Sequence, residues 1–111
     1  MKVAAVLEAL ALEVHCPGRS DAEIRRGTVG DLLSFVMGRC PEEAVWVTIQ
    51  NHVNVAAVAV LRDVPLIVLS DGRRPAPELA ERCLKESIAL ASSPLSAYEL
   101  CGRLYALGLE G

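Results

Sequence analysis

Two short runs, AVWVTIQ at 44–50 and PLIVLS at 65–70, are apolar at successive positions, so an extended chain would be hydrophobic on both faces. Strands of this kind lie in the middle of a sheet that is covered by helices on both sides. The alternating run LEVHC at 12–16 and the short run IALASS at 88–93 predict two further strands. The sequence therefore predicts a small, doubly covered sheet.

Segments with helical periodicity separate these strands. The predicted helices lie within residues 2–12, 32–40, 53–61, 75–87 and 93–111. Asp31 is expected to cap or open the second of them and Ser93 to cap the last, since short polar side chains accept hydrogen bonds from the first free N–H groups of a helix. The polar stretch 19–30 is expected to be a loop, with a short strand around Ile24.

The alternation of helices and strands predicts an α/β fold. We expect a three-layer α/β/α sandwich with a small, mostly parallel central sheet. The 111 residues amount to one domain, 1–111, with one hydrophobic core. Only 4% of the residues are aromatic, so Val, Leu, Ile and Ala must fill that core.

The segment 53–61 is ambiguous, because its apolar residues fit a helix or an alternating strand. The crossover needed between two buried parallel strands favours a helix. A helix that is apolar on nearly all sides must be covered on nearly all sides. This predicts a second subunit on its outer face, and hence a homodimer; cover by the N-terminal helix of the same chain is the alternative.

Composition argues against several classes of protein. A net charge of −3 without a basic stripe argues against a nucleic-acid partner. The longest nearly apolar run, 53–61, is too short to span a membrane, and Glu8 interrupts what would be a signal peptide, so a cytoplasmic protein is expected. The four cysteines are scattered and are expected to be reduced; His15 beside Cys16 is interpreted as packing rather than metal binding, and no cofactor is expected.

Polar side chains follow three of the predicted strands. They are Thr48, Gln50, His52 and Asn54, then Asp71, then Ser92 and Ser93. In open α/β sheets ligands bind beyond the carboxyl ends of the strands, where helix N-termini favour anions. These residues therefore predict a site for a nucleotide or another anionic metabolite. In the alternative interpretation Asn51 or Asn54 and Ser93 only cap helices, and His52 bonds across the edge of the sheet.

Evidence for catalysis is weaker. His52 could act as a general base oriented by Asp71, but no serine or cysteine stands in a nucleophile motif and no metal-ligand cluster is visible. The phosphate loop GxxxxGK is absent as well. An enzyme is therefore ranked below a binding module.

Three segments together resemble the DRTGG domain over nearly the whole chain. They are GTVGDLLSFVM, WVTIQNHVNVAAVAVLRDVPLIVLSDG and SSPLSAYELCGRLYALG, with the most specific matches at Thr48-Ile49-Gln50, His52, Asn54 and Ser93-Pro94-Leu95-Ser96. Domains of this family accompany CBS domains in regulated pyrophosphatases, occur in long phosphotransacetylases and also stand alone. Their fold is similar to the non-catalytic N-terminal domain of HPr kinase/phosphorylase. The resemblance implies a regulatory or ligand-sensing module, which as a stand-alone protein would act on a partner protein in trans.

One departure from the family pattern bears on the ligand. Where the family has Thr-Gly-Gly, this chain has Arg25-Arg26-Gly27. Two arginines block close backbone approach but offer guanidinium groups to a carboxylate or phosphate, so they are added to the candidate anion site. Solvated loop residues are the alternative.

Two functions of different kinds follow. The first is a dimeric sensor whose polar cluster takes an anionic metabolite. The second is a purely structural dimerisation or docking module, in which the helix 53–61 mates with its copy and charge substitutions at Val55 or Val58 dissociate the protein. The sensor is the preferred interpretation, and a small enzyme using His52 ranks third.

Overall fold

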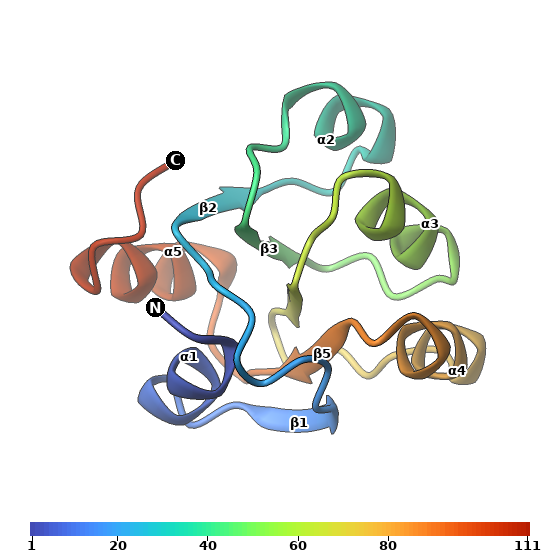
Figure 1. Cartoon of the computed structure of the whole chain (residues 1–111), viewed down its shortest axis with the longest axis horizontal. Coiled ribbons are helices and arrows are strands. Elements are labelled where there is room, and N and C mark those ends of the chain that lie inside the picture. The colour runs from blue at the N-terminus through green and yellow to red at the C-terminus, as the bar shows by residue number, and fades with distance from the viewer.

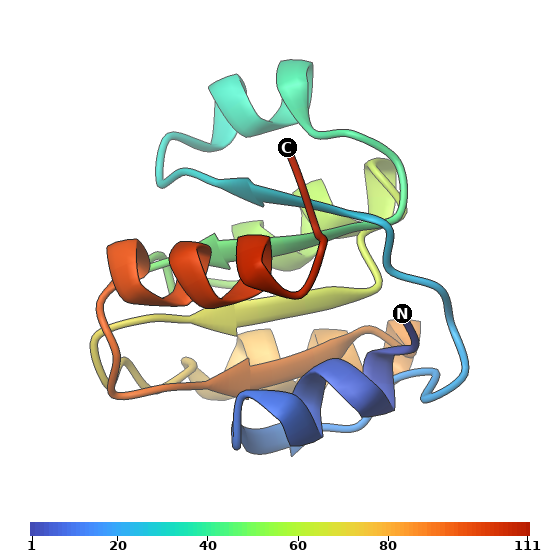
Figure 2. The same cartoon turned by 90° about the vertical axis from the view of Figure 1, so that its left-hand side faces the viewer.

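A five-stranded sheet forms the middle layer of the protein in a computed structural model that describes all 111 residues. Its strands are β1 (Glu13–Cys16), β2 (Arg26–Val29), β3 (Ala44–Thr48), β4 (Leu66–Leu69) and β5 (Ala89–Ser92). They lie in the order β1-β5-β4-β3-β2, with β2 to β5 parallel and β1 antiparallel to β5. The four parallel strands all point to the left in Figure 2.

Five helices cover both faces of this sheet. They are α1 (Val3–Ala9), α2 (Leu33–Arg39), α3 (Asn54–Leu61), α4 (Pro77–Glu86) and α5 (Ala97–Ala106). Helices α1 and α5 lie on one face, and α2, α3 and α4 lie on the other (Figure 1). The predicted α/β/α sandwich with a mostly parallel sheet is thus confirmed. None of the helices is long and apolar enough to cross a bilayer.

The sheet divides the core into two halves. Along β3, Val45 and Val47 pack towards α1 and α5, whereas Ala44 and Trp46 pack towards α2, α3 and α4. The Trp46 indole is fully buried, and its Nε1–H donates to the carbonyl of Gly30 at 2.9 Å. Every residue of β3, β4 and β5 is buried, as their continuous apolar sequences predict.

Helix α3 lies between α2 and α4, and this corrects the prediction that a second subunit must cover it. Its residues Val55, Ala56, Val58 and Ala59 are buried within the chain itself. The alternative cover, the N-terminal helix, lies on the opposite face of the sheet (Figure 1). Val55 and Val58 therefore do not face a partner, and a charge at either position would disrupt the core instead of an interface.

Three local predictions near helix and strand ends were also wrong. Strand β2 occupies part of the predicted loop 19–30, and its start lies two residues beyond Ile24; the sequence RGTV carries little apolar signal because an edge strand has fewer neighbours. Helix α2 has no side-chain cap, so Asp31 does not cap it. Helix α5 is capped by Ser96, whose Oγ accepts from the N–H of Glu99 at 3.2 Å, and not by Ser93.

Candidate functional site

The loops that follow β2, β3, β4 and β5 gather at one end of the strands, which we call the carboxyl rim: residues 30–32, 49–53, 70–76 and 93–96, with the last residues of the strands and Asn54, the first residue of α3. Among the predicted site residues it holds Thr48, Gln50, His52, Asn54, Asp71, Ser92 and Ser93. The strand ends bring these side chains to one edge, as their positions in the sequence predict. Hydrogen bonds then sort them into groups with different roles.

The first group joins the loops after β2 and β3. Thr48, which is 1% exposed, donates from Oγ1 to Asp31 Oδ1 at 2.9 Å. Asp31 Oδ1 also accepts from the N–H of Ile49 at 2.9 Å. The Gln50 side-chain amide donates to the Asp31 carbonyl at 3.1 Å, and the Gln50 N–H donates to Thr48 Oγ1 at 3.1 Å. Thr48 and Gln50 are therefore committed to bracing the two loops.

The second group joins the loops after β3 and β4. The side chain of Asn51 donates to the carbonyl of Arg74 at 2.7 Å and accepts from Arg73 at 3.3 Å. Its backbone carbonyl accepts from the N–H of Ala76 at 3.0 Å. Neither Asn51 nor Asn54 caps helix α3, which has no side-chain cap bond. Asn51 thus links the two loops and holds Arg73 and Arg74 at the carboxyl rim.

The turn at Asp71-Gly72 is tied to the loop after β5. Asp71 and Gly72 have φ values of +58° and +68°, and the Asp71 carboxylate accepts from the hydroxyl of Ser70 at 2.7 Å. Their N–H groups donate to the carbonyls of Leu95 and Ser93, each at 2.8 Å. Because its carboxylate is bonded to Ser70, Asp71 does not orient His52.

The third group surrounds Ser92, which is 4% exposed. Its Oγ donates to the carbonyl of Arg73 at 2.9 Å and lies 2.7 Å from His15 Nε2, which donates in return. Glu13 lies beside His15, with 3.8 Å between its carboxylate and the same ring nitrogen, and also pairs with the guanidinium of Arg74. Strand β1 thus supplies two ionisable side chains to this part of the rim.

A cavity of about 240 Å³ opens beside this group. It is lined by Ala11, Glu13, Gly72, Arg74, Ser92, Ser93 and Pro94. Strand β4 leads to α4 on one face of the sheet, whereas the neighbouring strand β5 leads to α5 on the other, so the two loops diverge here. Such a divergence is the topological switch point at which open α/β sheets bind their ligands. The polar cavity therefore lies where the fold favours a ligand.

His52 and Asn54, which stood at the centre of the predicted cluster, lie outside this cavity. Both are exposed, and neither side chain makes a hydrogen bond. No group in the structure fixes the His52 ring, so the suggested pairing of His52 with Asp71 is not formed. Ser92 and Ser93 are the predicted site residues that line the cavity.

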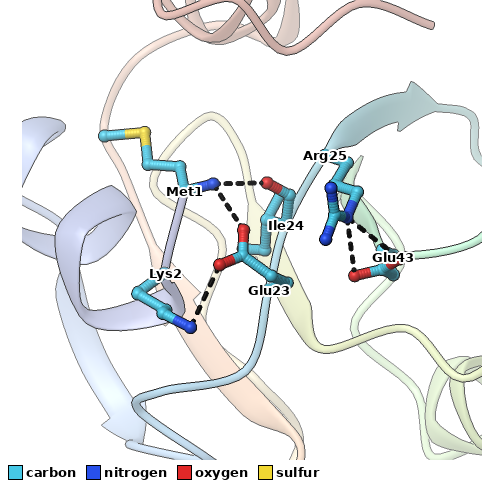
Figure 3. A network of polar contacts seen from close by, with 6 residues as sticks. All are labelled: Met1, Lys2, Glu23, Ile24, Arg25 and Glu43. Carbon is cyan, nitrogen blue, oxygen red and sulfur yellow. Dashed lines mark hydrogen bonds and ion pairs between the residues drawn. The ribbon is translucent and has the colours of Figure 1, made fainter.

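Arg25 and Arg26 lie at the opposite end of the sheet, where the parallel strands begin. The prediction that they belong to the site at the carboxyl rim was therefore wrong. Arg25 pairs with Glu43 at 3.2 Å, as Figure 3 shows, and Arg26 donates to the Gly111 carbonyl at 2.8 Å. In the same view Glu23 binds the amino terminus at 2.8 Å and Lys2 at 3.0 Å. Hydrogen bonds from the terminal ammonium group and then from Lys2 lower the pKa of Glu23 to about 2.

The cysteines stand apart from the rim chemistry. All four are free, and burial raises the pKa of the Cys83 thiol to about 12. Cys16 is buried and donates to the carbonyl of Ala80 at 3.3 Å, on the other side of β1 from His15. Nowhere do three His, Cys, Asp or Glu side chains converge in a way that would hold a metal ion.

Several rim residues were missed by sequence reasoning. Arg73 and Arg74 directly follow the Asp71-Gly72 turn at a predicted strand end, so their position was a readable signal. Glu13 and His15 carried no such signal, because only the antiparallel pairing of β1 with β5 places them at the rim. Asp31 was assigned to a helix cap because the predicted strand was placed around Ile24, several residues short of Val29, where β2 ends.

Comparison with known proteins gives a fold likeness. The chain is similar to the crystal structure of the CBS and DRTGG domains of the regulatory region of Clostridium perfringens pyrophosphatase, complexed with its activator, diadenosine tetraphosphate. The TM-score is 0.67 at 16% identity, over 94% of this chain and 45% of that one. The chain therefore corresponds to less than half of that structure and shares its fold. No protein-family model and no curated protein matches the sequence.

Proposed function

We propose that the protein is a non-catalytic regulatory module that senses a small anionic metabolite at the carboxyl rim and acts on a partner protein in trans. The observation that carries this proposal is the polar cavity at the switch point between the loops after β4 and β5. The likeness to a regulatory region that binds a dinucleotide activator, together with the resemblance to DRTGG domains, makes a nucleotide the first ligand class to test.

Arg74 is the residue that would bind an anion in this cavity. It lines the cavity and is held only by an exposed pair with Glu13, whose side chain also lines it. An exposed pair of this kind contributes ~1 kcal/mol or less, so a phosphate can displace Glu13 from the guanidinium at little cost. Ser93 supplies a hydroxyl donor, since within the chain its oxygen only accepts from the N–H of Leu95, and Gly72 lets the backbone come close.

The size of the cavity limits what it can enclose. Sites for whole drug-sized ligands usually measure about 300–1,000 Å³, and this one measures about 240 Å³. It therefore suits a phosphoryl or carboxylate end of a metabolite, with the remainder lying over the rim near Asn51 and His52. Nucleotides and phosphorylated metabolites fit this description.

A thermal-shift titration tests the proposal. Adenine and guanine nucleotides, diadenosine tetraphosphate and phosphorylated sugars are added to the parent, to Arg74→Ala and to Glu13→Gln. A ligand at a hundred times its Kd adds ~2.7 kcal/mol of stability, which corresponds to a rise in Tm of ~10 °C or more. We expect the shift to be lost in Arg74→Ala and to appear at lower ligand concentration in Glu13→Gln, because the competing carboxylate is gone.

Arg103→Ala serves as the matched control, since Arg103 is also an exposed arginine in a weak ion pair, with Glu99 on α5. It should shift like the parent. A shift that persists undiminished in Arg74→Ala, or the absence of a shift with every compound, would contradict a sensor site in this cavity.

A further inference from the structure

Strand β2 is an edge of the sheet, and its outward backbone is only partly covered. The N–H groups of Arg26 and Gly30 point inward, to Glu43 and Val47, so those of Gly27 and Val29 point outward. The Gly27 N–H donates to the Glu110 carbonyl at 2.9 Å, and no strand of this chain lies beyond Val29. Exposed edges of this kind pair readily with another strand.

Hollows flank this edge on both faces. On the side of α2 a groove of about 390 Å³ runs along residues 27–30, with the exposed side chains of Leu32 and Phe35 on its wall. On the side of α5 a smaller cavity of about 140 Å³ lies over Gly27, between Leu104, Tyr105 and Leu109. An added strand would have room for its side chains on each face.

We propose that β2 pairs antiparallel with β2 of a second copy of this chain, around a twofold axis at Thr28, and that residues 110–111 cover the edge in the monomer. This interface is separate from the rim cavity and independent of the proposed sensing function. In this register Gly27 of each copy lies opposite Val29 of the other copy. Each such pair exchanges two backbone hydrogen bonds, so all outward groups of both residues find partners.

Shape supports this register. Val29 is 53% exposed, and its side chain points to the α5 face of the sheet. Gly27 lies on the same face, since a Cβ atom added to it would lie 3.7 Å from Val45. Residues directly opposite in a sheet share a face, so Val29 of the second copy would enter the cavity over Gly27. Gly27 leaves the space that this valine needs, and the fit is reciprocal.

Charge supports the same register. Arg26 makes no ion pair within its own chain and lies on the α2 face. In the dimer it stands opposite Gly30 of the second copy, next to Asp31, whose Oδ2 takes part in no hydrogen bond. Once residues 110–111 leave the edge, the guanidinium of Arg26 is free, and the twofold axis would bring it beside the partly free Asp31 carboxylate of the other copy, on both sides of the axis. This self-complementarity favours a second copy over an unrelated peptide.

The C-terminal residues compete for the same edge. Glu110 forms a single bridge with Arg26, and Gly111 accepts a hydrogen bond from its side chain. Figure 2 shows this end of the chain rising from α5 towards β2. The tail leaves the outward groups of Val29 unpaired, so removal of residues 110–111 should strengthen the dimer.

Disulfide trapping at the proposed axis is the direct test. Thr28→Cys is made in a Cys101→Ser background, because Cys101 is the native thiol beside the smaller cavity. Opposed residues at a non-hydrogen-bonded antiparallel position have Cα atoms ~4.5 Å apart, within the range of a disulfide. We expect rapid formation of a disulfide dimer on mild oxidation. Val14→Cys, on the other edge strand and 45% exposed, is the matched control and should stay monomeric.

Sedimentation over a range of protein concentrations supplies the second measurement. The dimer should grow in the chain lacking residues 110–111 and be lost in Val29→Lys, while Val14→Lys behaves like the parent. Circular dichroism confirms that each variant is folded. Equal trapping in the Thr28→Cys and Val14→Cys variants, or a truncated chain that remains monomeric at every concentration, would overturn the proposal.

Discussion

Replacing Asp31 by alanine tests the bracing of the carboxyl rim. The carboxylate accepts from Thr48 Oγ1 and from the N–H of Ile49, each at 2.9 Å. Thr48 is 1% exposed, so its hydroxyl loses its acceptor at a part-buried position, whereas the N–H of exposed Ile49 regains a bond to water. An unsatisfied buried donor costs about 1–3 kcal/mol, and a hydrogen bond to a charged group adds ~1.5–3 kcal/mol. We expect Asp31→Ala to lower the free energy of unfolding by ~3 kcal/mol.

Urea denaturation of the parent, Asp31→Ala, Thr48→Val and the double variant measures this effect. Thr48→Val removes the buried hydroxyl while keeping its shape, so the double variant should be less destabilised than the sum of the two single changes. The coupling should be ~1 kcal/mol or more, with an unchanged m value. A loss below ~0.5 kcal/mol in Asp31→Ala, the usual range for surface substitutions, would refute the assignment of Asp31 as the brace.

Three further predictions follow from the packing, the capping and the charge network. Val58→Asp should unfold the chain, with loss of the near-ultraviolet circular dichroism signal, and not release folded monomers, because Val58 is 5% exposed in the half of the core that α3 shares with α2 and α4; a folded monomer would contradict this. Ser96→Ala should cost ~1 kcal/mol in urea denaturation, more than Ser93→Ala, because Ser96 is the observed cap of α5; equal losses would count against it. Since the pKa of Glu23 is about 2 in the fold against an ordinary 4.5, its contribution to stability is present above about pH 4.5 and is lost as the pH falls towards 2. Glu23→Gln should flatten that part of the plot of urea midpoint against pH, and an unchanged slope would show that the carboxylate is unpaired in solution.

The central layer of the fold could be predicted because strands that are buried on both faces have continuous apolar sequences. Strands β3 and β4 must be apolar on both faces, and the segment between them must be a helix to connect parallel neighbours. The edge strand β2 lacks this apolar pattern, since its sequence RGTV pairs with only one neighbouring strand and is partly open to water. Asp31 was misassigned for that reason: with the predicted strand centred on Ile24, the position of Asp31 next to the end of β3 did not follow.

The sequence predicted where on the sheet the candidate site lies better than it predicted which side chains form it. Strand ends gave the correct edge of the sheet for Thr48, Asp71 and Ser92. Which side chains line a cavity depends on contacts between distant segments, such as His15 with Ser92, that local patterns do not encode. The helix 53–61 shows the same limit, because its apolar surface indicated that it is covered but not that α2 and α4 cover it.

The antiparallel pairing of β1 with β5 also has a consequence for how the chain acquires its structure. From β2 to β5 each strand pairs with the next one along the sequence, so this part can assemble progressively as the polypeptide leaves the ribosome. Strand β1 is made first, yet its only neighbour in the sheet is made last, with Glu13 paired to Ser92. Strand β1 therefore cannot take its place in the sheet until nearly all of the chain has been translated, and its backbone stays open to other pairings until then.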